Sequence, residues 1–132
     1  MWAVSSGFGP HTPEQWLALS QAMVRPAPQG GYTLHYDPAI AVPFRTVTQE
    51  SAQAGEAALW KIYDAVTCET LLLRGALSDL LSADTARAMT GRGPKARLAV
   101  FDGVGHAPTL VAQDQRDLVA SFLLDPAGQR PA

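Results

Sequence analysis

The most constraining feature of this 132-residue sequence is a pair of short apolar runs with a capped helical segment between them. The runs are Thr70–Leu73 and Arg97–Phe101, and Ser82 stands where it can cap a helix that ends near Gly91. Short apolar runs bounded by polar residues are typical of strands buried on both faces. A strand, a helix and a second strand in this order predict two adjacent parallel strands flanked by helices. The predicted fold class is therefore α/β.

Helical patterns also lie outside this central unit. The spacing of apolar residues predicts helices over about 13–24 and 56–66, and a last helix after Pro108. Thr12 and Gln15 form a capping-box pattern at the start of the first of these helices. Residues 32–45 have a short, extended pattern that predicts a linking segment with at most one short strand.

Composition excludes several classes of protein. Lys and Arg total 10 against 12 for Asp and Glu, so the net charge of −2 provides no basic face for nucleic acid. The apolar runs are far shorter than the roughly 20 residues that span a bilayer, so no membrane partner is expected. The first residues lack a secretory pattern, which favours a cytoplasmic location. The single cysteine, Cys68, excludes an internal disulfide, and we expect it to be a small buried thiol.

The candidate chemistry lies just after the two predicted strands. Asp79 follows the first strand by a short loop, and His106 follows the second strand within Gly103-Val-Gly105-His106. We expect both glycines to let the backbone turn sharply, so that the histidine ring projects from the sheet edge. Parallel strands bring both loops to one edge of the sheet, where ligands gather in open α/β folds. A carboxylate that accepts the Nδ1 proton of an imidazole orients it as a general base. Asp102 is a rival acid because it is near His106 in sequence, although a role in the turn is favoured.

Metal or cofactor chemistry is not expected. The three histidines, at positions 11, 35 and 106, stand apart and have no metal-ligand spacing. His11, His35 and Trp16 are candidates for substrate contact, although structural roles are favoured for all three. We therefore expect no cofactor and no metal.

The motif Arg74-Gly-x-x-Ser78-Asp79 and the later motif Gly-x-Gly-His106-Ala-Pro, in which His106 stands 27 positions after Asp79, together resemble the C-terminal part of the α/β-hydrolase superfamily. In that family the triad acid follows strand seven and the histidine follows strand eight. The resemblance implies that Asp79 is the acid and His106 the base of a catalytic triad. It is strongest after about Glu56, and the earlier residues resemble the end of a cap region.

This resemblance implies a division of the chain into three parts. Residues 1–45 correspond to the end of the cap region and a linking segment, residues 46–124 to the C-terminal part of the hydrolase core, and residues 125–132 to a flexible tail. The fold expected is thus the C-terminal portion of the layered α/β-hydrolase fold.

The sequence departs from the family at the nucleophile. None of its serines has a glycine two residues away on both sides, so the Gly-x-Ser-x-Gly elbow is absent, as is an oxyanion loop of the His-Gly-Gly type. The resemblance therefore implies a C-terminal fragment of a hydrolase that acts on an ester, amide or related bond of a small-molecule substrate, and we expect this fragment to be inactive by itself. The alternative is a non-enzymatic α/β module for binding or assembly.

The first apolar run also predicts the partners of the chain. An open edge at Thr70–Leu73 would present unpaired backbone groups beside apolar side chains. We expect self-association through this edge, or association with a missing N-terminal half.

Overall fold

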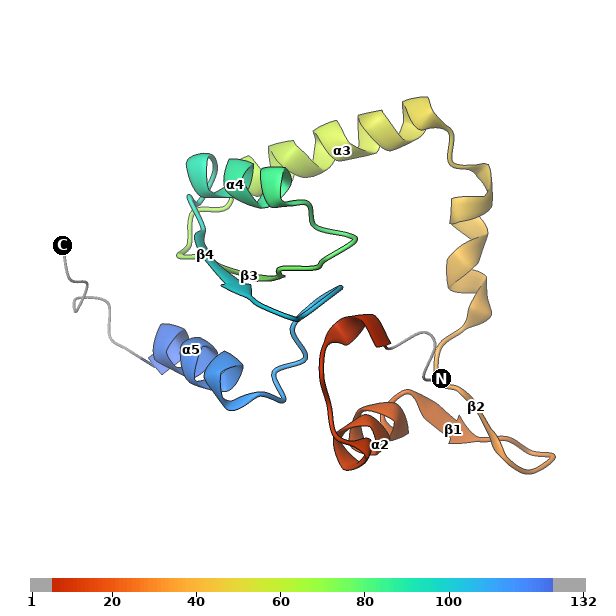
Figure 1. Ribbon diagram of the computed structural model, residues 1–132. Coiled ribbons are helices and arrows are strands. Elements are labelled where there is room, and N and C mark those ends of the chain that lie inside the picture. The colour runs from red at the N-terminus through yellow and green to blue at the C-terminus, as the bar shows by residue number, and fades with distance from the viewer. Residues whose placement is uncertain (1–5, 125–132) are drawn as a thin grey trace. The chain divides into compact units, whose positions relative to one another are not determined.

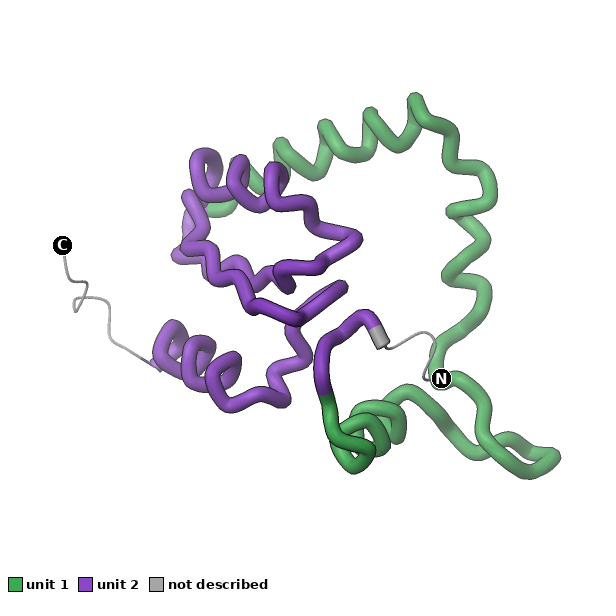
Figure 2. Tube along the Cα trace, in the orientation of Figure 1, with its two compact units in different colours: residues 1, 11–66 green, residues 2–10, 67–132 purple. Residues whose placement is uncertain are grey.

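The chain divides into two compact units (Figure 2). Of the residues that the structure describes, the first unit contains 11–66, and the second contains 6–10 together with 67–124. The computed structural model describes residues 6–124. The tail expected at 125–132 therefore lies outside the described residues.

The second unit contains the two strands that the sequence predicts. Strands β3 (Leu71–Gly75) and β4 (Arg97–Phe101) pair in parallel. Leu71 lies opposite Arg97, and Gly75 lies opposite Phe101. Both strands therefore end at the same edge of the sheet, which confirms the predicted parallel pair (Figure 1).

Helices follow each of these strands. Helix α4 (Ala83–Gly91) begins at Ser82, whose hydroxyl accepts a hydrogen bond from the Thr85 amide, as the capping pattern predicts. Helix α5 (Gln113–Leu124) lies on the side of the strands opposite α4 (Figure 1). The Arg97 guanidinium stands 5.6 Å from the centre of the Phe122 ring, and this contact links α5 to β4.

The expectation that both strands are fully buried is wrong. Their side chains are half-buried or exposed, and Val100 is 48% exposed. Among residues 6–124, the buried apolar residues are Ala86, Ala96 and Val104. A two-stranded sheet with one helix on each side has too little neighbouring structure to cover its apolar residues. Cys68 is likewise exposed instead of buried, because it lies in the turn before β3.

The first unit is built from short elements. These are α2 (Pro13–Gln21), β1 (Val24–Pro26), β2 (Tyr32–Leu34), the 3-10 helix η2 (Pro38–Thr46) and α3 (Gln49–Asp64). Strands β1 and β2 pair antiparallel, so the single short strand expected here is half of a hairpin. The capping box of Thr12 and Gln15 is present at the start of α2, which ends three residues earlier than predicted.

Two elements differ from the sequence-based expectation because of local caps. The Asp37 carboxylate accepts from the Ala39 amide and begins η2, where an extended segment was expected. Thr48 and Ser51 cap each other reciprocally, so α3 begins at Gln49 and not near Glu56. Along residues 6–124, no helix has the length and apolar character that crossing a membrane requires.

Candidate active site

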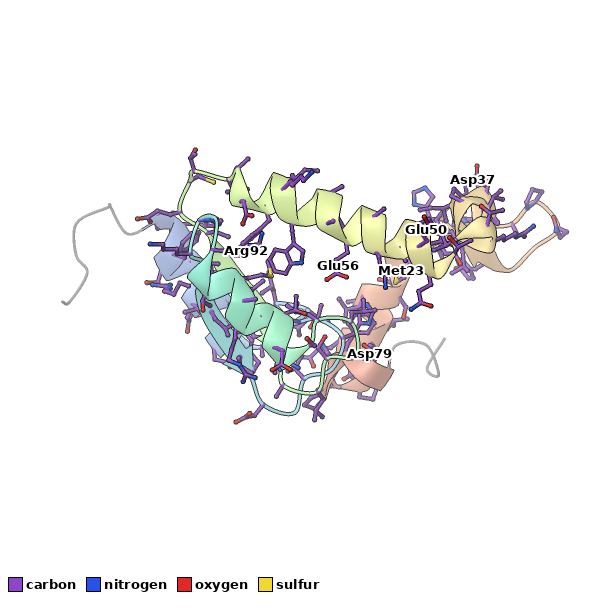
Figure 3. The ribbon with its side chains drawn as sticks, turned by 90° about the horizontal axis from the view of Figure 1, so that it is seen from above. Met23, Asp37, Glu50, Glu56, Asp79 and Arg92 are labelled. Atoms are coloured by element: carbon purple, nitrogen blue, oxygen red, sulfur yellow. The ribbon has the colours of Figure 1, made fainter. Side chains whose placement is uncertain are left out.

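The loop after β3 carries Asp79 and is held by hydrogen bonds from its own ends. Arg74 reaches across the loop, and its Nε donates to the Leu81 carbonyl at 2.7 Å. Ser78 caps the turn, because its hydroxyl accepts from the Leu81 amide at 3.2 Å. The loop leaves the Asp79 carboxylate at the surface (Figure 3).

The loop after β4 carries His106 and depends on two glycines for different reasons. Gly103 turns the chain with a φ of 69°, a conformation that other residues rarely adopt. Gly105 is buried, and its backbone lies against the carbonyl group of Gly7. A Cβ added to Gly105 would come closer than 3.0 Å to the Gly7 carbonyl oxygen. We expected both glycines to turn the chain sharply. The structure assigns that role to Gly103, whereas Gly105 allows close packing of two backbone segments.

The two candidate residues meet as the sequence predicts. Nδ1 of His106 lies 3.1 Å from Oδ1 of Asp79. The carboxylate on the imidazole is thus that of Asp79 and not that of Asp102. Since an ionised carboxylate can only accept, the bonded imidazole carries its proton on Nδ1, which leaves Nε2 able to take up a proton. The side chains are 76% and 38% exposed for Asp79 and His106 respectively, so water reaches the pair.

Three hydrogen bonds connect the two loops below this pair. The Ala76 amide donates to the Phe101 carbonyl at 2.9 Å, and the Leu77 amide donates to the Val104 carbonyl at 2.9 Å. Further along, the Ser78 hydroxyl donates to the carbonyl of His106 at 2.8 Å. These three hydrogen bonds are spaced along the two loops, from the ends of β3 and β4 as far as Ser78, which precedes Asp79, and His106 itself. They extend the pairing of the two strands as far as the candidate site.

An aromatic ring that the sequence analysis did not single out also contacts the pair. Phe8, in the short 3-10 helix η1 (Ser6–Phe8), packs edge-on against His106 with 5.0 Å between ring centres. Nearly 100 positions separate the two residues, and nothing in the local pattern around Phe8 indicates this contact. The absence of a Cβ at Gly105 allows this segment to approach the His106 loop closely, because the Gly7 carbonyl occupies the space that a Cβ would need.

The other histidines lie in the first unit. The His11 ring packs on Trp16 with 4.5 Å between ring centres, and His35 is exposed after β2. Across the part of the chain that the structure describes, no group of three or more His, Cys, Asp or Glu side chains could hold a metal ion.

Known proteins resemble this chain in sequence and in structure. A 3-hydroxybutyrate-oligomer hydrolase from Cupriavidus necator is 45% identical over an alignment of 123 residues, and the match covers 90% of this chain and 42% of that protein. An α/β hydrolase from Novosphingobium aromaticivorans superposes with a TM-score of 0.70 at 30% identity, covering 92% of this chain and 43% of that structure. The chain has an α/β-hydrolase fold. No family model matches the sequence.

A second solved structure agrees with the α/β-hydrolase fold. It is that of a proposed hydrolase from Rickettsia typhi, with a TM-score of 0.72 at 24% identity over 92% of this chain and 39% of that one. This chain therefore spans about two-fifths of the length of each relative. The expected fold class and the resemblance to α/β hydrolases are confirmed.

Proposed function

We propose that this chain supplies the acid and the base of an α/β-fold hydrolase, Asp79 and His106, whose nucleophile lies in polypeptide outside these 132 residues. The observation that carries the proposal is the 3.1 Å contact between Nδ1 of His106 and the Asp79 carboxylate. This contact favours the tautomer in which Nε2 takes a proton from an attacking group and later returns it to the leaving group. In this scheme Asp79 stabilises the imidazolium that forms in between.

The substrate class we propose is an ester of a small hydroxy acid. The relative from Cupriavidus necator is described as a 3-hydroxybutyrate-oligomer hydrolase, and the units of a hydroxy-acid oligomer are joined by ester bonds. The match covers 90% of this chain, so the aligned region includes both loops of the pair. Hydrolysis of such an ester through an acyl-enzyme requires the proton transfers assigned to His106.

A chimera tests this proposal. The matched 42% of the Cupriavidus protein is replaced by this chain, so that the remainder of that protein can supply the nucleophile. We expect the chimera to hydrolyse 3-hydroxybutyrate oligomers, and we expect His106→Ala to lower kcat/KM by about 10²- to 10⁴-fold, the usual contribution of a general base.

The control is Glu50→Gln, which neutralises an exposed carboxylate in the first turn of α3. It should leave kcat/KM within about twofold, as expected for a surface change of under 0.5 kcal/mol. A folded chimera in which both variants are equally active would refute the proposed function. That result would favour the alternative, a non-enzymatic module.

A further inference from the structure

We propose that Ser78 is a positioning residue that sets the register between the Asp79 loop and the His106 loop. The proposal rests on the proposed roles of Asp79 and His106 and extends them to a neighbour that contacts the backbone of both loops. The Ser78 hydroxyl donates to the carbonyl of His106 itself, 28 positions away, and accepts from the Leu81 amide of its own loop.

The contact between Asp79 and His106 is too exposed to align the two loops by itself. Pairs of charged or polar groups this accessible to water contribute little, because water competes for both partners. Their alignment must therefore come from the backbones that carry them. The hydrogen bond from Ser78 to His106 is part-buried. Of the three hydrogen bonds between the two loops, it is the nearest in sequence to Asp79 and to His106.

Of the three hydrogen bonds between the two loops, the bond from the Ser78 hydroxyl is the one that a side-chain substitution can remove. The bonds at Ala76 and Leu77 join backbone to backbone, so side-chain changes leave their atoms in place. Removing the Ser78 hydroxyl would release the His106 carbonyl and the Leu81 amide while both strands stay paired. The Asp79 carboxylate would then meet Nδ1 in a smaller fraction of molecules.

The experiment observes the His106 ring in the full 132-residue chain by nuclear magnetic resonance with nitrogen-15-labelled histidine. At alkaline pH the neutral ring exists as two tautomers, and the nitrogen shifts report their ratio. We expect the ratio of the Nδ1–H to the Nε2–H tautomer to be lower in Ser78→Ala than in the parent, by up to about fivefold, the equivalent of one net hydrogen bond. Ser78→Thr, which keeps the hydroxyl, should restore the ratio.

The matched control is Ser82→Ala. This change removes another serine hydroxyl from the same segment and uncaps α4. It should lower the free energy of unfolding without changing the tautomer ratio, because Ser82 bonds within the first turn of α4. If Ser78→Ala fails to fold, Ser78→Cys keeps the shape with a weaker donor, and an intermediate ratio is expected.

Two outcomes would overturn the proposal. One is an unchanged tautomer ratio in folded Ser78→Ala or, if that variant does not fold, in Ser78→Cys. The other is a fall in the tautomer ratio of Ser82→Ala that equals the fall in Ser78→Ala.

The variant Asp79→Asn distinguishes a failure of the positioning role of Ser78 from a failure of the proposed function. If Asp79→Asn changes the ratio and the Ser78 variants do not, the positioning role fails and the pair stands. If Asp79→Asn changes nothing, both fail.

Discussion

Replacing Gly75 with alanine would add a methyl group where the two loops of the site touch. Gly75 is buried at the end of β3, and an added Cβ would come closer than 3.0 Å to the carbonyl oxygens of Val104 and Gly105. These atoms belong to backbone, so they cannot move aside as a flexible side chain would. We expect the variant to be less stable, by an amount that follows from the geometry.

Two routes of relief give a similar magnitude. If the loops stay in place, the overlap costs about 1–3 kcal/mol, the usual range for overpacking. If the loops part, the hydrogen bonds from Leu77 to Val104 and from Ser78 to His106 are lost, at roughly 1 kcal/mol each. Either route predicts that Gly75→Ala lowers the free energy of unfolding by about 2 kcal/mol.

Urea denaturation followed by circular dichroism measures this loss, and hydrogen exchange at the Leu77 amide shows whether the loops have parted. Gly55→Ala is the matched control. Gly55 lies inside α3, and an added Cβ there meets nothing within 4 Å. Because alanine favours the helix, this variant should be more stable by about 0.5–1 kcal/mol. Equal stability of Gly75→Ala and the parent, with an equally protected Leu77 amide, would refute the reasoning.

Three further predictions concern the same unit. Asp79→Asn should change the free energy of unfolding by less than about 1 kcal/mol, because the pair is exposed; a loss above 2 kcal/mol in urea denaturation would contradict this. The chain by itself should hydrolyse a p-nitrophenyl ester no faster than the Asp79→Ala, His106→Ala double variant; faster turnover would contradict the assignment of the nucleophile to other polypeptide. The chain should self-associate, since within residues 6–124 β3 pairs with β4 alone and Leu77 is exposed; a 14.0 kDa monomer by light scattering would disprove this.

The sequence predicts the elements that hold the site because their signals are local. Strand β4 has the predicted bounds, whereas β3 begins one residue later and ends two residues later than predicted. Ser82 caps α4 as expected, since a hydroxyl before a helix satisfies free amides whatever surrounds it. The contact of Asp79 with His106 followed from one further step, that parallel strands end at the same edge.

The features that were missed depend on packing between distant segments. The contact of Phe8 with His106 joins segments almost 100 positions apart, and no periodicity indicates it. The role of Gly105 depends on the approach of Gly7, which the loop's own sequence does not show. Burial of the strands was overestimated, because the rule for buried strands assumes that neighbouring strands and helices cover both faces. The two strands of this sheet have few such neighbours among the described residues.

The measurement that tests the central claim most directly is a double-mutant cycle on kcat/KM in the chimera, with Asp79→Asn, His106→Ala and the two combined. If Asp79 acts through the imidazole of His106, its carboxylate has nothing to act on once that ring is removed. We therefore predict that the double variant is no slower than His106→Ala alone. Losses that multiply, so that Asp79→Asn slows the His106→Ala enzyme as much as it slows the parent, would contradict the account.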